Sequence, residues 1–309
     1  MISIRRSWYR YRVRAVIRIL QMPIVRIFII IFAILNIQQV WTVHSALSSG
    51  RSTQAVASPA LPADLPLQYR IPSHSRRVYI AAIHWNNAAI LRSHWNDAVV
   101  ALADALGPEN VYVSVHESGS WDDSKAALAE LDAALAARGV GRTVRTSFVS
   151  HYDEISRPHG DDDEGWIRTS SGRSELRRIP YLSKLRNESI KRLRQLKEEE
   201  GIEFDRVLFL NDVVFTTQDV LELLDTNYGR YAAACSMDYK LPPAIYDTFA
   251  LRDADGNEAI MQTWPYFGAR ASRRAMMTNT PVPVTSCWNG IGELVDELVK
   301  STYEQRKAS

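Results

Sequence analysis

The sequence predicts an α/β fold in which a mostly parallel sheet is flanked by helices on both faces. Two observations support this prediction. From Arg77 onward, short β-branched and apolar runs alternate with stretches whose apolar residues recur at helical spacing. Turn and capping residues such as Gly107-Pro108 separate the two kinds of segment. Strands that alternate with helices form βαβ units, whose ligands bind at the carboxyl ends of the strands.

The N-terminal part of the chain differs from the rest in charge. Residues 1–63 contain eight arginines and no acidic residue, so the total charge of +2 leaves −6 for the remainder. A basic end on an acidic body indicates targeting, and not binding of nucleic acid by the body. We therefore interpret residues 1–26 as a basic cytosolic tail.

Residues 27–44 are expected to form a transmembrane signal anchor. The run from Ile27 to Val43 carries no charge, and at about 1.5 Å per residue it spans roughly 25 Å, a little less than a bilayer core of about 30 Å. The preceding arginines predict a cytosolic N-terminus and a lumenal body. A cleavable signal peptide and an organelle transit peptide are the alternatives. Residues 45–75, dominated by Ser, Pro and Ala, are expected to form a flexible stem.

The globular body, residues 76–309, gives the expected elements in chain order. Residues 88–107 place Ile90, Trp95 and Leu102 on one helical face, and residues 120–139 begin with an acidic turn and end at a glycine. Residues 151–174 have no period and are expected to form a loop. The expected strands are 77–83, 110–117, 143–150, 204–210 and 230–237, and the further helices are 175–199 and 216–226.

Few covalent features are readable from the sequence. Cys235 and Cys287 allow one disulfide in an oxidising compartment, and two buried thiols fit the sequence equally well. Asn187-Glu188-Ser189 is a sequon for N-glycosylation. The motifs G-x-G-x-x-G, G-x-x-x-x-G-K-[ST], H-E-x-x-H and G-x-S-x-G do not occur. Their absence argues against a dinucleotide oxidoreductase, a P-loop enzyme and a zincin.

Asp212 interrupts the apolar segment 207–215, VLFLNDVVF. An unpaired carboxylate inside a buried strand costs several kcal/mol or more, so we expect Asn211 and Asp212 where the strand ends and opens into a ligand cleft. A carboxylate there suits a divalent cation that holds a nucleotide diphosphate, because hard cations prefer oxygen ligands. The usual second acid of an Asp-x-Asp pair is missing, since Leu210 and Val214 occupy its positions. The alternative is that Asp212 caps the turn into the next helix.

Three blocks of the sequence carry a family resemblance: E-S-G-S-W-D at 117–122, F-L-N-D-V-V-F at 209–215 and S-C-W-N-G at 286–290. In this order they resemble the fungal capsule-associated α-1,3-mannosyltransferase family, glycosyltransferase family 69, over roughly residues 76–291. The resemblance implies a GT-A-like nucleotide-sugar transferase fold, a type II Golgi enzyme and GDP-mannose as donor. It also implies a divalent cation such as Mn²⁺ and transfer with retention of the anomeric centre.

Carried over to this sequence, the resemblance assigns roles to eleven side chains. Asp212 holds the metal, and no general base is assigned, because the departing phosphate can take the acceptor proton. Structural alternatives exist: Glu117 as a helix N-terminal acid, Asn187 as an exposed glycan site, Asp253 in a plain turn and Trp288 in the core. The assigned residues are Asp212 and Asp238 as catalytic, Glu117, Ser118, Arg186, Asn187 and Asn211 for the donor, and Asp247, Asp253, Trp288 and Asn289 for the acceptor.

After Ile291 the chain reads GELVDELVKSTYEQRKAS, which is short, polar and helix-prone. It does not resemble the continuation of the family. We hypothesise that it is translated from an unspliced intron, which would truncate the domain, remove part of the acceptor site and place activity in doubt. Transcript sequencing across codon 291 tests this hypothesis.

These observations predict a metal-dependent, retaining α-1,3-mannosyltransferase of the Golgi membrane. It would transfer mannose from GDP-mannose to a mannose-containing cell-surface or capsule-type glycan. One alternative is a catalytically inactive, membrane-tethered homologue that binds glycan or assembles with an active transferase. The other is the same fold with a UDP-sugar donor.

Overall fold

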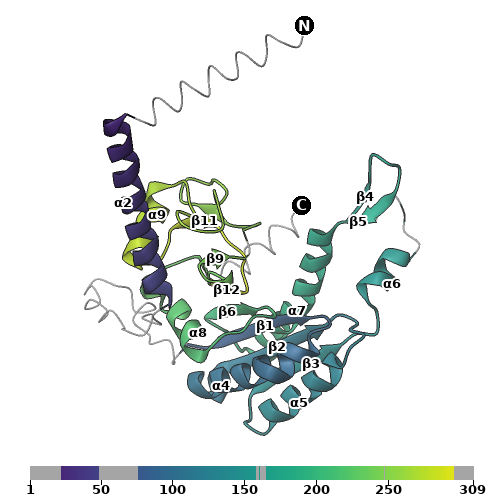
Figure 1. Cartoon of the computed structure of the whole chain (residues 1–309). Helices are drawn as coiled ribbons and strands as arrows, with labels where there is room; N and C mark the ends of the chain where they lie inside the picture. Colours follow the sequence, from purple (N-terminus) through teal and green to yellow (C-terminus); the bar gives the residue numbers. More distant parts are fainter. Residues whose placement is uncertain (1–21, 49–75, 158–159, 161–164, 247, 296–309) are drawn as a thin grey trace. The chain divides into compact units, whose positions relative to one another are not determined.

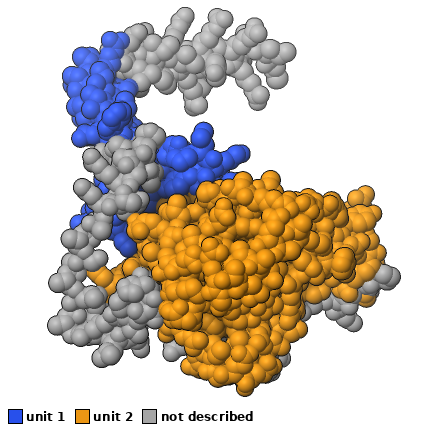
Figure 2. Space-filling view, turned by 90° about the horizontal axis from the view of Figure 1, so that it is seen from below, with its two compact units in different colours: residues 1–57, 239–248, 252–285 blue, residues 58–238, 249–251, 286–309 orange. Residues whose placement is uncertain are grey.

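The computed structural model describes residues 22–48, 76–157, 160, 165–246 and 248–295. The chain divides into two compact units (Figure 2). One, the sheet unit, comprises residues 58–238, 249–251 and 286–309. The other, the small unit, comprises residues 1–57, 239–248 and 252–285.

The sheet unit is built on a six-stranded sheet with the order β3-β2-β1-β6-β12-β7 among the described residues (Figure 1). Strands β3, β2, β1 and β6 are parallel, and β12 runs antiparallel to both β6 and β7. The predicted α/β class with a mostly parallel sheet is therefore confirmed. The strands are β1 (Val78–His84), β2 (Val111–Glu117), β3 (Gly141–Thr146), β6 (Arg206–Leu210), β7 (Ala233–Cys235) and β12 (Ile291–Val295).

Alternation along β1 explains why helices cover both faces of the sheet. Val78 and Ile80 pack in a core cluster with side chains of α4 (Asn96–Leu106), α5 (Ser124–Ala136) and α8 (Thr217–Leu224). Tyr79 and Ala81 point to the opposite face and pack with Leu193 and Leu196 of α7 (Arg178–Glu200). Figure 1 shows α4 and α5 on one side of the sheet and α7 on the other. Both faces of the central strands are thus buried.

The expected helix 88–107 is divided at its start. It consists of α3 (Ala88–Ile90), a π-helical turn η4 (Leu91–Trp95) and α4. Helix α7 tolerates Pro180 because the proline lies in its first turn, where backbone N–H groups have no helical partner. Short 3-10 turns follow α4 at η5 (Pro108–Asn110) and α8 at η6 (Thr226–Gly229).

Residues 151–174, expected to be a loop, contain regular structure. They include α6 (His151–Ser156) and strand β4 (Trp166–Arg168), which pairs with β5 (Ser174–Leu176). Helix α6 begins with a capping box, in which the Ser150 hydroxyl accepts from Asp153 N at 3.2 Å and Asp153 accepts from Ser150 N at 2.8 Å. Elements of three to six residues are too short to show a period, so the prediction failed here.

The first residues after Ile291 form a strand, although the composition of the tail is helix-prone. Residues Ile291–Val295 form β12, which inserts between β6 and β7. Glu293 is fully buried there, and its Oε1 lies 2.9 Å from Arg206 Nε. Long-range pairing therefore overrides the local helix propensity of this segment.

The sequence allowed either a disulfide or two free thiols, and the structure contains the disulfide. Cys235 and Cys287 are bonded, with Cα atoms 6.2 Å apart across a separation of 52 residues. The bond joins the end of β7 to the segment that carries Trp288 and Asn289. It therefore helps to place two of the predicted site residues.

The small unit contains short elements and one long helix, α2 (Pro23–Ser48). Its other elements are β8 (Tyr239–Leu241), β9 (Ala244–Ile245), β10 (Arg252–Asp253), α9 (Arg270–Thr278) and β11 (Val284–Ser286), of which the last residue belongs to the sheet unit. Strands β8 and β9 pair with each other, as do β10 and β11.

The predicted transmembrane helix is also wrong. Residues 27–44 do lie in α2, but no helix in the described parts of the chain combines the length and the apolar character that a bilayer span requires. Asn36, Gln38 and Gln39 interrupt the apolar run, and polar side chains are costly in hydrocarbon. The expected tail, up to residue 21, and the expected stem, from residue 49, lie outside the described residues.

Candidate functional site

The loops that follow β1 and β6 meet at the carboxyl edge of the sheet. Asp212 lies two residues past the end of β6, and its side chain is exposed. Its Oδ2 accepts a hydrogen bond from Asn87 Nδ2 at 3.0 Å. Trp95 Nε1 donates to the carbonyl oxygen of Asn211 at 2.9 Å, which fixes the backbone just before Asp212. The geometry thus presents one carboxylate to solvent at the strand end.

The orientation of Asn87 is set by its neighbours. Its Oδ1 accepts from Trp85 N at 3.0 Å and lies 3.2 Å from His84 Nδ1. Burial lowers the pKa of His84 to about 4, so the imidazole is neutral at neutral pH. Because Asn87 Oδ1 can only accept a hydrogen bond, Nδ1 is the ring nitrogen that carries the hydrogen. With its oxygen engaged in this way, Asn87 turns its amide nitrogen toward Asp212. His84 and Asn87 therefore position the carboxylate.

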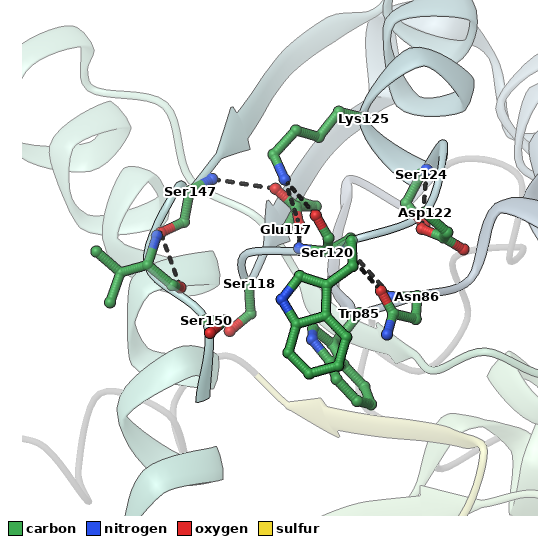
Figure 3. A network of polar contacts seen from close by, with 12 residues as sticks. Trp85, Asn86, Glu117, Ser118, Ser120, Asp122, Ser124, Lys125, Ser147 and Ser150 are labelled. Carbon is green, nitrogen blue, oxygen red and sulfur yellow. Dashed lines mark hydrogen bonds and ion pairs between the residues drawn. The ribbon is translucent and has the colours of Figure 1, made fainter. Parts of the chain in front are cut away.

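Glu117, the last residue of β2, is hydrogen-bonded to both the loop that follows β2 and the loop that follows β3 (Figure 3). Its side chain is fully buried. One oxygen accepts from Ser120 N and lies 3.3 Å from Lys125 Nζ, and the other accepts from Ser147 N at 3.1 Å. Both oxygens are therefore engaged inside the protein, which favours a structural role over contact with a donor.

The E-S-G-S-W-D block supports the loop after β1 through backbone and side-chain contacts. Asn86 N donates to Ser120 Oγ at 2.9 Å, and Asn87 N donates to Ser124 Oγ at 2.8 Å. Gly119 has a φ of +67°, and a side chain there would overlap the backbone of Val149. The block thus holds Asn86 in place, and Ser124, two residues beyond the block, holds Asn87.

Two exposed tryptophans, Trp85 and Trp121, stand beside this loop. Their side chains are 45% and 70% exposed, and their ring centroids are 5.5 Å apart in an edge-on arrangement. Figure 3 shows the Trp85 indole beside Asn86, whose Oδ1 accepts from Trp121 N at 2.8 Å. Exposed aromatic faces of this kind can stack on a base or a sugar ring.

A second group of predicted residues is bonded together between β6, β7 and β12. Asn211 Nδ2 donates to the Asn289 carbonyl at 2.9 Å, and Asn289 Nδ2 donates to the Ser236 carbonyl at 2.7 Å. Asp238 accepts from Ser236 Oγ at 2.7 Å and from Gly290 N. A Cβ at Gly290 would overlap Val213 and lie 2.8 Å from Asp238 Oδ2, so only glycine fits here.

Helix α7, which carries Arg186 and Asn187, covers the face of the sheet opposite α4 and α5. The Arg186 guanidinium lies 4.4 Å from the ring centroid of Trp288, which also packs against Phe209. Asn187 lies at an exposed position of this helix. Ser118 is buried, and its Oγ lies 2.9 Å from the Tyr181 hydroxyl.

Two predicted acceptor residues are not brought into this group. Asp247 lies outside the described residues. Asp253 belongs to the small unit and is fully buried. Its carboxylate accepts from Asp255 N, Asn257 N and Ala269 N at 2.7 to 3.0 Å. These contacts are those of a turn residue, which was the alternative to an acceptor role for Asp253.

The residues present fit a cation that brings most of its own ligands. Within the described parts of the chain, no three His, Cys, Asp or Glu side chains are grouped to hold a metal. Mg²⁺-like cations in nucleotide sites need only one or two carboxylates, with phosphates and water completing the shell. Asp212 has one oxygen held by Asn87 and the other free of hydrogen bonds from the described residues. It suits this mode and not an all-protein cage.

A comparison with protein families decides the class of the chain. Residues 77–307 match the family described as cryptococcal mannosyltransferase 1. The chain belongs to this mannosyltransferase family. The match includes residues 292–307, which had seemed foreign to the family from the sequence.

Other comparisons add little to the family assignment. No curated protein matches this mannosyltransferase family member. Among solved structures, it is similar to the mannosyltransferase PcManGT from Pyrobaculum calidifontis in complex with GDP-Man and Mn²⁺, at 12% identity and a TM-score of 0.30. That similarity covers 54% of this chain and 38% of the other.

Glu117→Ala is expected to destabilise the mannosyltransferase by about 3 kcal/mol or more. The change leaves the buried N–H groups of Ser120 and Ser147 without partners, at roughly 1–3 kcal/mol each. Chemical denaturation measures the loss, and Glu198→Ala, at an exposed position of α7, is the control. A loss of less than about 1 kcal/mol would return Glu117 to the list of donor-binding candidates.

His84 and Asn87 were not predicted as site residues. Both lie in the segment H-W-N-N at the end of β1. Their position at the carboxyl end of a parallel strand is the sequence signal that could have found them, because ligands bind at such strand ends.

Proposed function

We propose that the protein transfers mannose from GDP-mannose to a mannose-containing glycan, with a divalent cation, preferably Mn²⁺, held at Asp212. Family membership supports the reaction class. The observation that supports the site is the Asn87–Asp212 hydrogen bond, which orients an exposed carboxylate at the carboxyl edge of β1 and β6. An α-1,3 linkage and retention of the anomeric centre are the finer parts of the proposal.

Each part of the edge has a task in this proposal. When bound, the cation neutralises charge on the diphosphate as the sugar–phosphate bond breaks. Asp212 holds it, and Asn87 and His84 keep the carboxylate in place. Arg186, stacked on Trp288, is proposed to bind the diphosphate. A guanidinium group can donate two parallel hydrogen bonds to two oxygens of one phosphate.

Asp238 is assigned a positioning role and not proton transfer. Its two oxygens accept from Ser236 Oγ and Gly290 N, which keeps the Gly290 turn against Val213, next to Asp212. No other carboxylate of the described edge is placed as a general base. In a retaining reaction the leaving phosphate accepts the proton from the acceptor hydroxyl, so none is required.

Release of GDP from GDP-mannose by the purified full chain tests this function. We expect release with Mn²⁺, none after chelation by EDTA, and recovery when Mn²⁺ is added back. UDP-galactose in place of GDP-mannose is the control for the donor. Release that persists in EDTA would contradict the metal dependence.

A second candidate function is a catalytically inactive homologue that binds glycan. It is favoured by Leu210 and Val214, which occupy the positions of the second acid in an Asp-x-Asp pair. Under this function the full chain would bind mannose oligosaccharides but release no GDP under any metal. The same assay therefore separates the two candidates.

We further place the protein in an oxidising compartment such as the Golgi lumen. The Cys235–Cys287 disulfide supports this placement, because disulfides persist in the secretory pathway and are rare in the cytosol.

A further inference from the structure

A small cavity with both polar and apolar walls lies beyond the carboxyl ends of β2 and β3, against α7. Its volume is about 190 Å³. Pockets that enclose a whole drug-sized ligand measure about 300–1,000 Å³, so this one has room for a single ring system. All of its walls belong to the sheet unit. Its polar lining includes His116, Ser118, Glu154, Tyr181, Lys184 and Glu188.

Of the two carboxylates in the lining, Glu188 retains its capacity to accept hydrogen bonds. Glu154 is paired on both oxygens, with Lys184 Nζ at 3.3 Å and Arg157 Nε at 3.1 Å. The cations nearest to Glu188 are Lys191 at 3.7 Å and Arg145 at 4.0 Å. Both distances are too long for a hydrogen bond. Glu188 thus offers two acceptor oxygens, and its side chain is 40% exposed.

The rest of the lining supplies donors and a neutral ring. The Lys184 ammonium is 60% exposed and lies one helical turn before Glu188 on α7. His116 projects from β2, and its Nδ1 is buried with no hydrogen-bond partner among the described residues. Burial lowers the pKa of His116, which favours the neutral imidazole. The wall formed by α7 therefore presents the two carboxylate oxygens of Glu188 beside the Lys184 ammonium.

We propose that this cavity holds the guanine base of the donor nucleotide, with Glu188 accepting hydrogen bonds from N1–H and the 2-amino group. The inference rests on the proposed function and deepens it. Guanine presents two donors next to one carbonyl, so the carboxylate meets the donors and the Lys184 ammonium meets O6. Uracil presents one donor between two carbonyls, and a carboxylate repels those carbonyls. Adenine has an unprotonated N1, which a carboxylate also repels.

The cavity lies at a suitable distance from Asp212. In the order β3-β2-β1-β6, two strand spacings separate the ends of β2 and β6. At about 4.8 Å each, they amount to a separation of roughly 10 Å across the sheet, which a nucleoside diphosphate spans between its base and its β-phosphate. Trp85 and Trp121 come from the loops after β1 and β2 at the same edge of the sheet. One nucleotide can therefore reach both the cavity and the carboxylate.

Nucleotide binding by the full chain tests the inference. Titration calorimetry with Mn²⁺ would compare GDP, UDP and xanthosine diphosphate for wild type, Glu188→Gln and the control Glu198→Gln on the same helix. We expect wild type to bind GDP at least about tenfold more tightly than UDP. Glu188→Gln should lose that preference and gain xanthosine diphosphate, because its amide N–H can donate to the 2-carbonyl of xanthine. Glu198→Gln should behave as wild type.

The outcomes separate this inference from the function on which it rests. A gain of xanthosine diphosphate binding cannot result from misfolding. Equal affinities of wild type for GDP and UDP, or a GDP preference that survives Glu188→Gln, would overturn the base assignment. GDP release by the wild type would in that case still stand. If the wild type neither binds GDP nor releases it, the proposed function fails as well.

Discussion

Asp212→Ala is expected to lower the rate of GDP release from GDP-mannose at least about 100-fold while the fold is kept. Changes one shell outside a metal typically cost about 10–100-fold, so loss of the ligand itself should cost more. The side chain is exposed and makes one hydrogen bond, to Asn87, so its removal creates no buried cavity. Steady-state GDP release over a range of Mn²⁺ concentrations measures the effect, and circular dichroism checks the fold.

Two further variants define what the loss means. Asp97→Ala, at an exposed position of α4, is the matched control and should leave GDP release unchanged. Asn87→Ala should fall between the two, with a weaker dependence on Mn²⁺, because Asn87 acts through Asp212. If Asp212→Ala keeps activity close to that of Asp97→Ala, Asp212 is a turn residue and not a metal ligand.

Arg206→Met is expected to destabilise the sheet unit by about 3–5 kcal/mol, because removing one partner of a buried ion pair leaves the other charge uncompensated. Arg206 and Glu293 are 8% and 0% exposed in their side chains, with 2.9 Å between Nε and Oε1. Tyr231 donates to the other oxygen of Glu293 at 2.5 Å. The control is Arg138→Met, whose surface pair with Asp104 should contribute less than about 1 kcal/mol.

The pH dependence gives this prediction a second readout. Burial raises the pKa of Glu293 from 4.5 to about 7, against the opposing effects of Tyr231 and Arg206. The folded state keeps the proton longer than the unfolded state, so this group's contribution is full below pH 4.5 and is lost as the pH rises through 7. Arg206→Met should therefore cost less at pH 5 than at pH 8 in urea denaturation. Equal losses at both pH values would contradict the assignment.

The parts of the fold with strong local periodicity could be predicted from the sequence. Strands β1, β2 and β6 and helices α4 and α5 follow from apolar spacing, capping and turn residues. Strand β12 could not, because Glu293 looks like a surface residue until Arg206, far away in the chain, is seen beside it. The Cys235–Cys287 bond stayed open for the same reason, since pairing depends on a distance that only the fold sets.

The candidate site was predictable in its carboxylate and not in its supports. Asp212 follows from the cost of an acid in an apolar strand, which places it at a strand end. Its place at a strand end marks Asn87 as a candidate, but its role depends on a contact with Asp212 across 125 positions of the chain, which the sequence does not give. Glu117 was assigned to the donor by resemblance, yet the structure engages both of its oxygens with the protein. The prediction of a membrane anchor was wrong because the charge-free run contains Asn36, Gln38 and Gln39, whose polar side chains lower its apolar character.

The central claim is that a cation bound at Asp212 holds the diphosphate of the donor. Anomalous diffraction from crystals of the full chain soaked with Mn²⁺ and GDP tests it most directly. We predict a manganese peak in contact with a carboxylate oxygen of Asp212 and an oxygen of the β-phosphate. Bound GDP with manganese on other side chains, or with Asp212 turned away from the diphosphate, would contradict the claim.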